Sequence, residues 1–153
     1  MQSKGVPIVP GEAVSAVYTA AVDSVLLRPL VGSCIQAGFP SPAQDYIEHS
    51  LDLNEHLISH PVATFFVRVQ GLSMVNAGIF PDDILIVDRS LEPRHNSIII
   101  AAVDGELTVK RLSIQAGCWQ LLPENPEFSA FDITEDTDFS VWGVVTYAIH
   151  RAV

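Results

Sequence analysis

The first candidate for a catalytic role is a serine at the end of a predicted strand, because a serine hydroxyl can act as a nucleophile. Ser73 follows Gly71-Leu72 directly after the alternating stretch Phe65–Gln70. A serine on such a turn can expose its hydroxyl beside backbone N–H groups that could bind an oxyanion. A serine at a strand end is more often a turn or capping residue. The position alone therefore gives a candidate nucleophile without settling its role.

The second candidate is Lys110, which lies inside the apolar stretch Leu107–Leu112. Lysine is unusual there except on an edge strand, where it discourages aggregation, and this stretch alone favours the edge interpretation. The alternative is a desolvated lysine, whose pKa falls from ~10.4 by up to ~3–5 units toward neutrality. A neutral lysine can take the proton of a serine hydroxyl, so Ser73 and Lys110 could form a serine–lysine variant of the catalytic triad.

Other chemical motifs are weaker. His56 and His60 have a spacing that could share a metal ion, but Leu57 stands where the zinc-protease pattern needs a glutamate. We interpret them as surface histidines, and the acidic cluster at 135–138 as a solvated turn. The sequence has no glycine-rich phosphate loop and no paired CxxC motif. It therefore predicts no cofactor and no metal.

The composition is that of a globular protein of one domain, or one domain plus an arm. The chain has 153 residues, of which 48% are apolar and 17% charged. Its net charge, 8 − 18 = −10, argues against binding to a phosphate backbone or an anionic membrane. No stretch reaches the ~18 apolar residues of a membrane span. Residues 13–22 resemble a short signal sequence, but nearby charges argue against secretion. We interpret Cys34 and Cys118 as reduced thiols in a cytoplasmic protein.

The first 37 residues are expected to form an N-terminal arm. They contain three prolines and no long alternation of apolar and polar residues, although residues 12–27 could form a short helix. The next segment, Gly38-Phe39-Pro40-Ser41-Pro42, should be extended and exposed, because each proline restricts its own φ and the residue before it. An extended segment of this kind is what a protease cleft binds.

The rest of the chain is expected to be mostly β. Residues 43–60 are predicted to be helical, capped by Asp52 or Ser50 and ended by Pro61. From about residue 62 the pattern changes to at least six strands, and Asp104-Gly105 marks a tight hairpin with positive φ. These strands are Phe65–Gln70, Ile84–Val87, Ile98–Val103, Glu106–Leu112, Trp119–Leu122 and Val141–Ile149. A curled antiparallel sheet or partial barrel is the fold that this order favours.

Seven motifs in order are similar to those of the UmuD proteins, which are the self-cleaving SOS mutagenesis subunits of the LexA-like family. The resemblance runs from about residue 36 to the C-terminus. The motifs are Ala37-Gly38-Phe39-Pro40-Ser41-Pro42-Ala43, Gly71-Leu72-Ser73-Met74, Ile86-Val87-Asp88, the stretch from Ile100 to Glu106, Thr108-Val109-Lys110-Arg111-Leu112, Leu122-Pro123-Glu124-Asn125 and Gly143-Val144-Val145.

The resemblance implies a role for each candidate. Ser73 corresponds to the nucleophile and Lys110 to the general base, and the interval 110 − 73 = 37 equals the family's spacing. The scissile bond would be Ala37–Gly38, so residues 1–37 would be removed from a peptidase and dimerisation domain at 38–153. The implied fold is a mostly β, LexA/UmuD-like curled antiparallel sheet with an extended N-terminal arm and one or two short helices.

The resemblance also implies a pathway and partners. A RecA filament on single-stranded DNA would stimulate self-cleavage. The trimmed homodimer would then join a UmuC-like Y-family DNA polymerase in translesion synthesis during error-prone repair, with no sequence-specific DNA binding of its own. Some positions depart from the UmuD pattern. Leu72 replaces the usual aspartate, Ala37 the usual cysteine, and Asp82 and Asn96 stand where glycine-containing turns are common.

Three alternatives share parts of this pattern. A LexA-like repressor would need an N-terminal helix-turn-helix, which 37 residues with three prolines and few basic residues cannot supply. A signal peptidase would need a membrane anchor, and we find none. The third alternative is a catalytically inactive LexA-like binding or regulatory module. The presence of Ser73, Lys110 and the Ala37–Gly38 bond together argues for the self-cleaving peptidase.

Overall fold

The fold was analysed in a computed structural model, which describes residues 13–20, 25–31, 38 and 47–153. The contacts divide the chain into two units, residues 1–20 with 60–153 and residues 21–59. Each unit is described below by itself. The first contains the sheet and both candidate catalytic residues.

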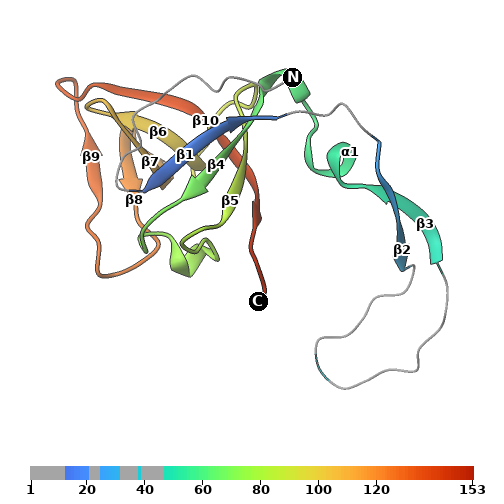
Figure 1. The fold of residues 1–153 in the computed structure, drawn as a ribbon. Helices are drawn as coiled ribbons and strands as arrows, with labels where there is room; N and C mark the ends of the chain where they lie inside the picture. The colour runs from blue at the N-terminus through green and yellow to red at the C-terminus, as the bar shows by residue number, and fades with distance from the viewer. Residues whose placement is uncertain (1–12, 21–24, 32–37, 39–46) are drawn as a thin grey trace. The chain divides into compact units, whose positions relative to one another are not determined.

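An eight-stranded antiparallel sheet forms the first unit (Figure 1). The order of its strands across the sheet is β1-β4-β5-β10-β6-β7-β8-β9. Their bounds are β1 Val14–Thr19, β4 Thr64–Val69, β5 Ile84–Asp88, β6 Ile98–Val103, β7 Glu106–Gln115, β8 Cys118–Leu122, β9 Phe131–Ile133 and β10 Phe139–Ile149. Two 3₁₀ turns, Pro61–Ala63 and Val75–Ala77, flank β4.

The sheet curls on itself. Strands β1 and β7 are separated by four other strands in the sheet order, yet they contact each other. Long twisted sheets curl in this way, and the curl here brings the end of β4 toward β7. The predicted mostly β, partly closed sheet is confirmed.

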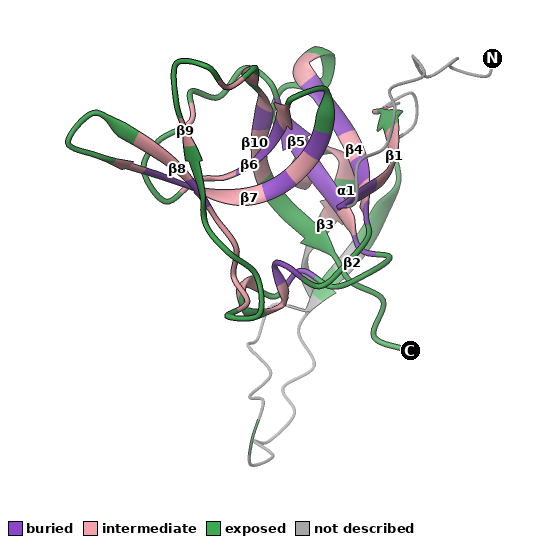
Figure 2. Cartoon of the chain, turned by 90° about the vertical axis from the view of Figure 1, so that its left-hand side faces the viewer, coloured by how far each residue is buried: buried purple, intermediate pink, exposed green. Residues whose placement is uncertain are grey.

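The buried residues lie along the strands of the sheet (Figure 2) and form two separate clusters. Ile100 and Val109 point into the larger core cluster, whereas Ile99 and Leu112 belong to a second cluster. Successive residues of a strand point to opposite faces, so the continuous apolar run at 98–103 is explained by burial on both sides.

The tight hairpin that the sequence predicted at Asp104-Gly105 is present. Asp104 and Gly105 have φ of 49° and 87°, which are the angles of a tight two-residue hairpin between β6 and β7. Asp82 and Asn96 also take positive φ, 71° and 72°. The turns at these two positions are therefore made without glycine.

The second unit contains a hairpin and a short helix. Strand β2 (Leu27–Val31) pairs antiparallel with β3 (Ile47–Asp52), and α1 follows at Leu53–Leu57. Asp52 caps α1 by accepting a hydrogen bond of 2.9 Å from the backbone N–H of Asn54. The predicted helix over 43–60 is confirmed only at 53–57. It is wrong for 47–52, because pairing with β2 makes that part a strand, and for 58–60, which follow the end of α1. Residues 43–46 lie outside the described part.

The short helix considered for 12–27 is also wrong over the described positions. Residues 14–19 form β1, which pairs with β4, and β2 begins at Leu27. Val14 is fully buried in the main core cluster, and Val17 packs against that cluster. Pairing along β4 satisfies the backbone and buries these β-branched side chains, which a small isolated helix could not do.

Candidate functional site

The curl of the sheet brings Ser73 and Lys110 together. Ser73 lies on the turn after β4 and Lys110 in the middle of β7, and Lys110 Nζ is 2.9 Å from Ser73 Oγ. Ser73 is only 7% exposed and Lys110 is partly buried. The two candidates that the sequence singled out separately therefore form one hydrogen-bonded pair.

Lys110 is not on an edge strand. Strand β7 lies between β6 and β8, and Lys110 is opposite Ile99 of β6. The edge interpretation is therefore wrong. The amine lies 3.1 Å from Thr108 Oγ1 and 3.1 Å from the carbonyl oxygen of Val109. Lys110 therefore lies on an interior strand and still has polar partners for its amine.

The turn that carries Ser73 begins at a glycine. Gly71 has φ of 85°, a conformation that glycine adopts without strain, and the chain then bends so that Leu72 is exposed while Ser73 is buried. Within the described part of the chain, the backbone N–H of Ser73 makes no hydrogen bond. An N–H group in this position could donate to an oxyanion formed beside Ser73 Oγ.

Glu124 connects the serine turn to β7. Its backbone N–H donates to the carbonyl of Ser73 at 2.7 Å, and its own carbonyl accepts from Asn76 N at 2.9 Å. Its carboxylate pairs with Arg111 Nε, and Arg111 Nη1 donates to the carbonyl of Asn96 at 2.8 Å. Glu124 thus contacts the backbone of Ser73 and Asn76 in the serine turn and the side chain of Arg111, the residue next to Lys110.

Asn125 adds a further link to the same turn. Its side-chain amide donates to the carbonyl of Leu72 at 3.0 Å. The candidate nucleophile is therefore positioned by hydrogen bonds from the 124–125 segment, which follows β8. Sequence reasoning did not give Arg111, Glu124 or Asn125 a role. The only signal was that they lie inside two of the motifs quoted for the UmuD resemblance.

A cleft of about 770 Å³ opens at the pair. It is large enough to hold several residues of an extended peptide. Ala13, just before β1, and Phe128 contribute to its walls. The other lining residues come from the serine turn and from the β6–β7 hairpin: Gln70, Gly71, Leu72, Ser73, Val103, Asp104, Glu106, Leu107, Thr108 and Lys110.

The predicted scissile bond is only partly described. Ala37 lies outside the described residues. Gly38 is exposed, and a Cβ atom added to it would meet nothing within 4 Å. In this conformation a larger side chain at 38 is therefore tolerated, which matters for the experiments below.

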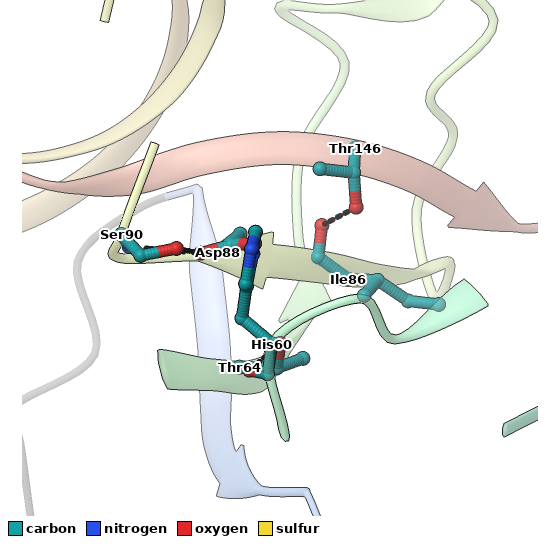
Figure 3. A network of polar contacts seen from close by, with 6 residues as sticks. All are labelled: His60, Thr64, Ile86, Asp88, Ser90 and Thr146. Carbon is teal, nitrogen blue, oxygen red and sulfur yellow. Dashed lines mark hydrogen bonds and ion pairs between the residues drawn. The ribbon is translucent and has the colours of Figure 1, made fainter. Parts of the chain in front are cut away.

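A second polar network lies at the other end of β4 (Figure 3). His60 Nδ1 is 2.6 Å from Asp88 Oδ2, and Ser90 donates to Asp88 Oδ1 from its backbone N–H at 2.8 Å and its hydroxyl at 2.6 Å. Burial raises the pKa of Asp88, but the hydrogen bonds from Ser90 and His60 outweigh it, so the pKa lies below the usual aspartate value. This network joins the start of β4 to the end of β5.

The other sequence motifs form no centre in the part of the chain that the structure describes. No group of three or more histidine, cysteine, aspartate or glutamate side chains is arranged to hold a metal ion there. His60 contacts Asp88, and Cys118 is an exposed free thiol. None of the described helices is long and apolar enough to cross a membrane.

Comparison of the sequence with known proteins identifies its family. The family model described as Peptidase S24-like matches residues 29–146. The chain is similar to ImpA of Salmonella typhimurium, at 46% identity over 84% of this chain and 88% of the relative. It is also similar to MucA of Escherichia coli, at 45% identity over 75% of this chain and 79% of the relative. The LexA repressor of Bordetella avium is 35% identical over 97% of this chain and 70% of its own length. The chain therefore belongs to the Peptidase S24-like family, as a UmuD-like, self-cleaving SOS mutagenesis protein with serine peptidase chemistry.

Proposed function

We propose that Ser73 is the nucleophile and Lys110 the general base of a reaction that cuts the chain's own Ala37–Gly38 bond. The observation that carries this proposal is the 2.9 Å contact between Lys110 Nζ and Ser73 Oγ. The contact lies in a cleft of peptide-binding size, on a serine whose backbone is held by Glu124. Small residues on both sides of the cut suit a close-fitting site.

Lys110 Nζ is placed to exchange a proton with Ser73 Oγ, from which it lies 2.9 Å, and it also contacts Thr108 Oγ1 and the Val109 carbonyl. As an ammonium it donates to these oxygens and has no lone pair, so it cannot act as a base. Once it has lost a proton, its lone pair can accept the proton of the Ser73 hydroxyl.

The reaction follows from these positions. Ser73 Oγ attacks the carbonyl carbon of Ala37 while its proton moves to Lys110 Nζ. The tetrahedral intermediate collapses, the bond to the nitrogen of Gly38 breaks, and Lys110 returns the proton to that nitrogen. Water then attacks the acyl ester with Lys110 again as base, which releases the Ala37 carboxylate and restores Ser73.

The biological setting is part of the same proposal. A RecA filament on single-stranded DNA stimulates the cut, and the trimmed homodimer joins a UmuC-like Y-family polymerase as an accessory subunit in translesion synthesis in the cytoplasm. The support is the similarity to the UmuD-like relatives ImpA and MucA. The net charge of −10 fits contact with proteins better than direct contact with DNA.

Mass spectrometry of the purified protein, incubated with and without a RecA–single-stranded DNA filament, tests this function. The expected product starts at Gly38 and contains 153 − 37 = 116 residues. A Gly38→Leu variant should fold normally, because position 38 is open, but should resist cleavage in a close-fitting site. A product with another N-terminus would overturn the assigned bond. An intact chain under all conditions would favour the inactive binding module.

A further inference from the structure

The segment upstream of the proposed cut contributes a strand to each of the two units. Strand β1 pairs with β4, from Val14 opposite Val69 to Thr19 opposite Phe65. Strand β2 pairs with β3, and the Ala37–Gly38 bond lies in the connection between them. Hydrolysis of that bond therefore breaks one peptide link and none of the strand pairings that the structure describes.

The pairing of β1 buries apolar surface as well as backbone. Val14 is fully buried and Ala13 is 7% exposed, both in the main core cluster. The ladder continues beyond β1, since Gln70 N donates to the carbonyl of Ala13 at 2.9 Å. Without β1, the edge of β4 would present unpaired N–H and C=O groups, which is the kind of surface that binds an added strand.

We propose that the severed segment 1–37 stays bound to the rest of the protein, as a two-strand ligand held on β4 and β3. This inference rests on the proposed cleavage. The two strand pairings of the fragment reinforce each other. If β1 separates from β4, the pairing of β2 with β3 keeps β1 close to β4, so that it can bind again. Release of the segment is then a step separate from hydrolysis.

The catalytic cleft is affected by the same arrangement. Ala13 lines the cleft beside Ser73 and lies on the upstream side of the cut. A retained segment therefore keeps this wall in place after cleavage, and only its release uncovers the edge of β4 and opens the cleft. The occupant of this edge is the chain's own residues 13–19, as a bound strand.

Size-exclusion chromatography of the fully cleaved protein tests the proposal. Under native conditions, fragments 1–37 and 38–153 should elute together in equal amounts, and in denaturant they should separate. Elution of the larger fragment alone under native conditions would overturn the proposal.

A substitution in β1 identifies the anchor. Val14→Asp places a charge at a fully buried position and should weaken retention more than about tenfold. Tyr18→Ser, at an exposed position of the same strand, should leave retention unchanged. Equal retention in Val14→Asp and the unaltered chain would contradict the role of β1. If circular dichroism shows Val14→Asp to be unfolded, competition by a synthetic peptide of residues 12–20 decides, because it should displace the fragment where a scrambled peptide does not.

A second form of the protein separates this inference from the proposed function. Ser73→Ala, with the recognition site of a sequence-specific protease inserted between Ala37 and Gly38, can be cut without the catalytic pair. If the unaltered chain does not cleave itself, the proposed function fails, and this form still shows whether the severed segment is retained. Loss of the segment after the added protease has cut would overturn the inference alone.

Discussion

Lys110 contacts Ser73, Thr108 and Val109 through its amine, and its replacements distinguish a base from a structural charge. Lys110→Ala and Ser73→Ala should both abolish cleavage. Lys110→Arg should be equally inactive, because a guanidinium stays protonated at any usable pH. A time course followed by mass spectrometry measures this, with circular dichroism to establish that each variant is folded. Cleavage at the normal rate by any of the three would rule out the assigned roles.

We expect Arg111 to act on the candidate nucleophile from a distance, through Glu124. Its pairing with Glu124 fixes the residue that holds the Ser73 carbonyl, so Arg111→Ala should let the serine turn shift and slow cleavage by about 10- to 100-fold. The pH dependence of the remaining rate should be unchanged, since Lys110 is still present. Arg111→Lys should recover part of the rate, and Arg94→Ala, at an exposed site, should have no effect. A displaced pH profile in Arg111→Ala would mean that it acts on Lys110 itself.

The Asp88 carboxylate should make the free energy of unfolding depend on pH in the acid range. Because its folded-state pKa lies below that of the unfolded chain, its carboxylate adds stability above the unfolded value, and this is lost as the pH falls through the folded value. In a Ser73→Ala background, the free energy of unfolding in urea should therefore fall between pH 5 and 3. An Asp88→Asn variant should lose less over this range. Identical pH dependence in both proteins would show that Asp88 does not carry the effect.

Strand β10 packs so closely on β5 that its glycine has no room for a side chain. A Cβ atom at Gly143 would lie 2.7 Å from Val87 Cγ1 and 3.0 Å from the carbonyl oxygen of Asp88. Gly143→Ala should cost about 1–3 kcal/mol of unfolding free energy, as overpacking does. Ser140→Ala, at an exposed position of β10, should change it by less than about 0.5 kcal/mol. Urea denaturation of both variants tests this, and equal stability would show that β10 can move away from β5.

The strands that could be predicted from the sequence are those whose buried residues give a clear pattern of apolar positions. Strands β4 to β8 and β10 come from apolar alternation or continuous apolar runs, and the turn between β6 and β7 from Asp104-Gly105. Strand β9 has only three residues, two of them exposed, so its sequence carries little signal. Strand β1 was not predicted, because its valines and its one alanine also fit a short helix, and its contacts with β4 and β7 decide between the two.

The candidate site divides in the same way. Ser73 and Lys110 could be singled out by residue type and spacing, since a serine after a glycine turn and a lysine among apolar residues are both unusual. The contact between Ser73 and Lys110 depends on how the sheet curls, which no local pattern records. The link from Arg111 to Glu124 depends on the register in which β7 pairs with β8. Ala13 joins the cleft wall through a strand pairing of long sequence separation, which is equally invisible locally.

At the scale of the whole molecule, the proposed function makes enzyme and substrate parts of one chain or one dimer. Cleavage should therefore be first order and independent of protein concentration as long as the assembly stays intact. The rate should rise with pH from 6 toward 10, because only the neutral form of Lys110 is a base. Gel time courses across this range, at two protein concentrations, measure both properties. A rate that is flat with pH or highest in acid would exclude a lysine base, and a rate proportional to protein concentration would indicate cutting between separate assemblies.

Because two cationic residues are neighbours in β7, we expect the protein to be sensitive to the deletion of a single residue from the β6–β7 hairpin. Lys110 and Arg111 are adjacent and point to opposite sides of the strand, one toward Ser73 and the other toward Glu124. Deletion of one codon between Gly105 and Lys110 would move Arg111 into the place of the base and leave Glu124 facing Leu112. Most strands tolerate the exchange of one positive charge for another. Here a shortened hairpin would keep nearly the same composition and net charge, but it would remove Lys110, the proposed proton acceptor, from its place beside Ser73. Length variation in this hairpin should consequently be far rarer among active descendants of this gene than substitution of its exposed residues.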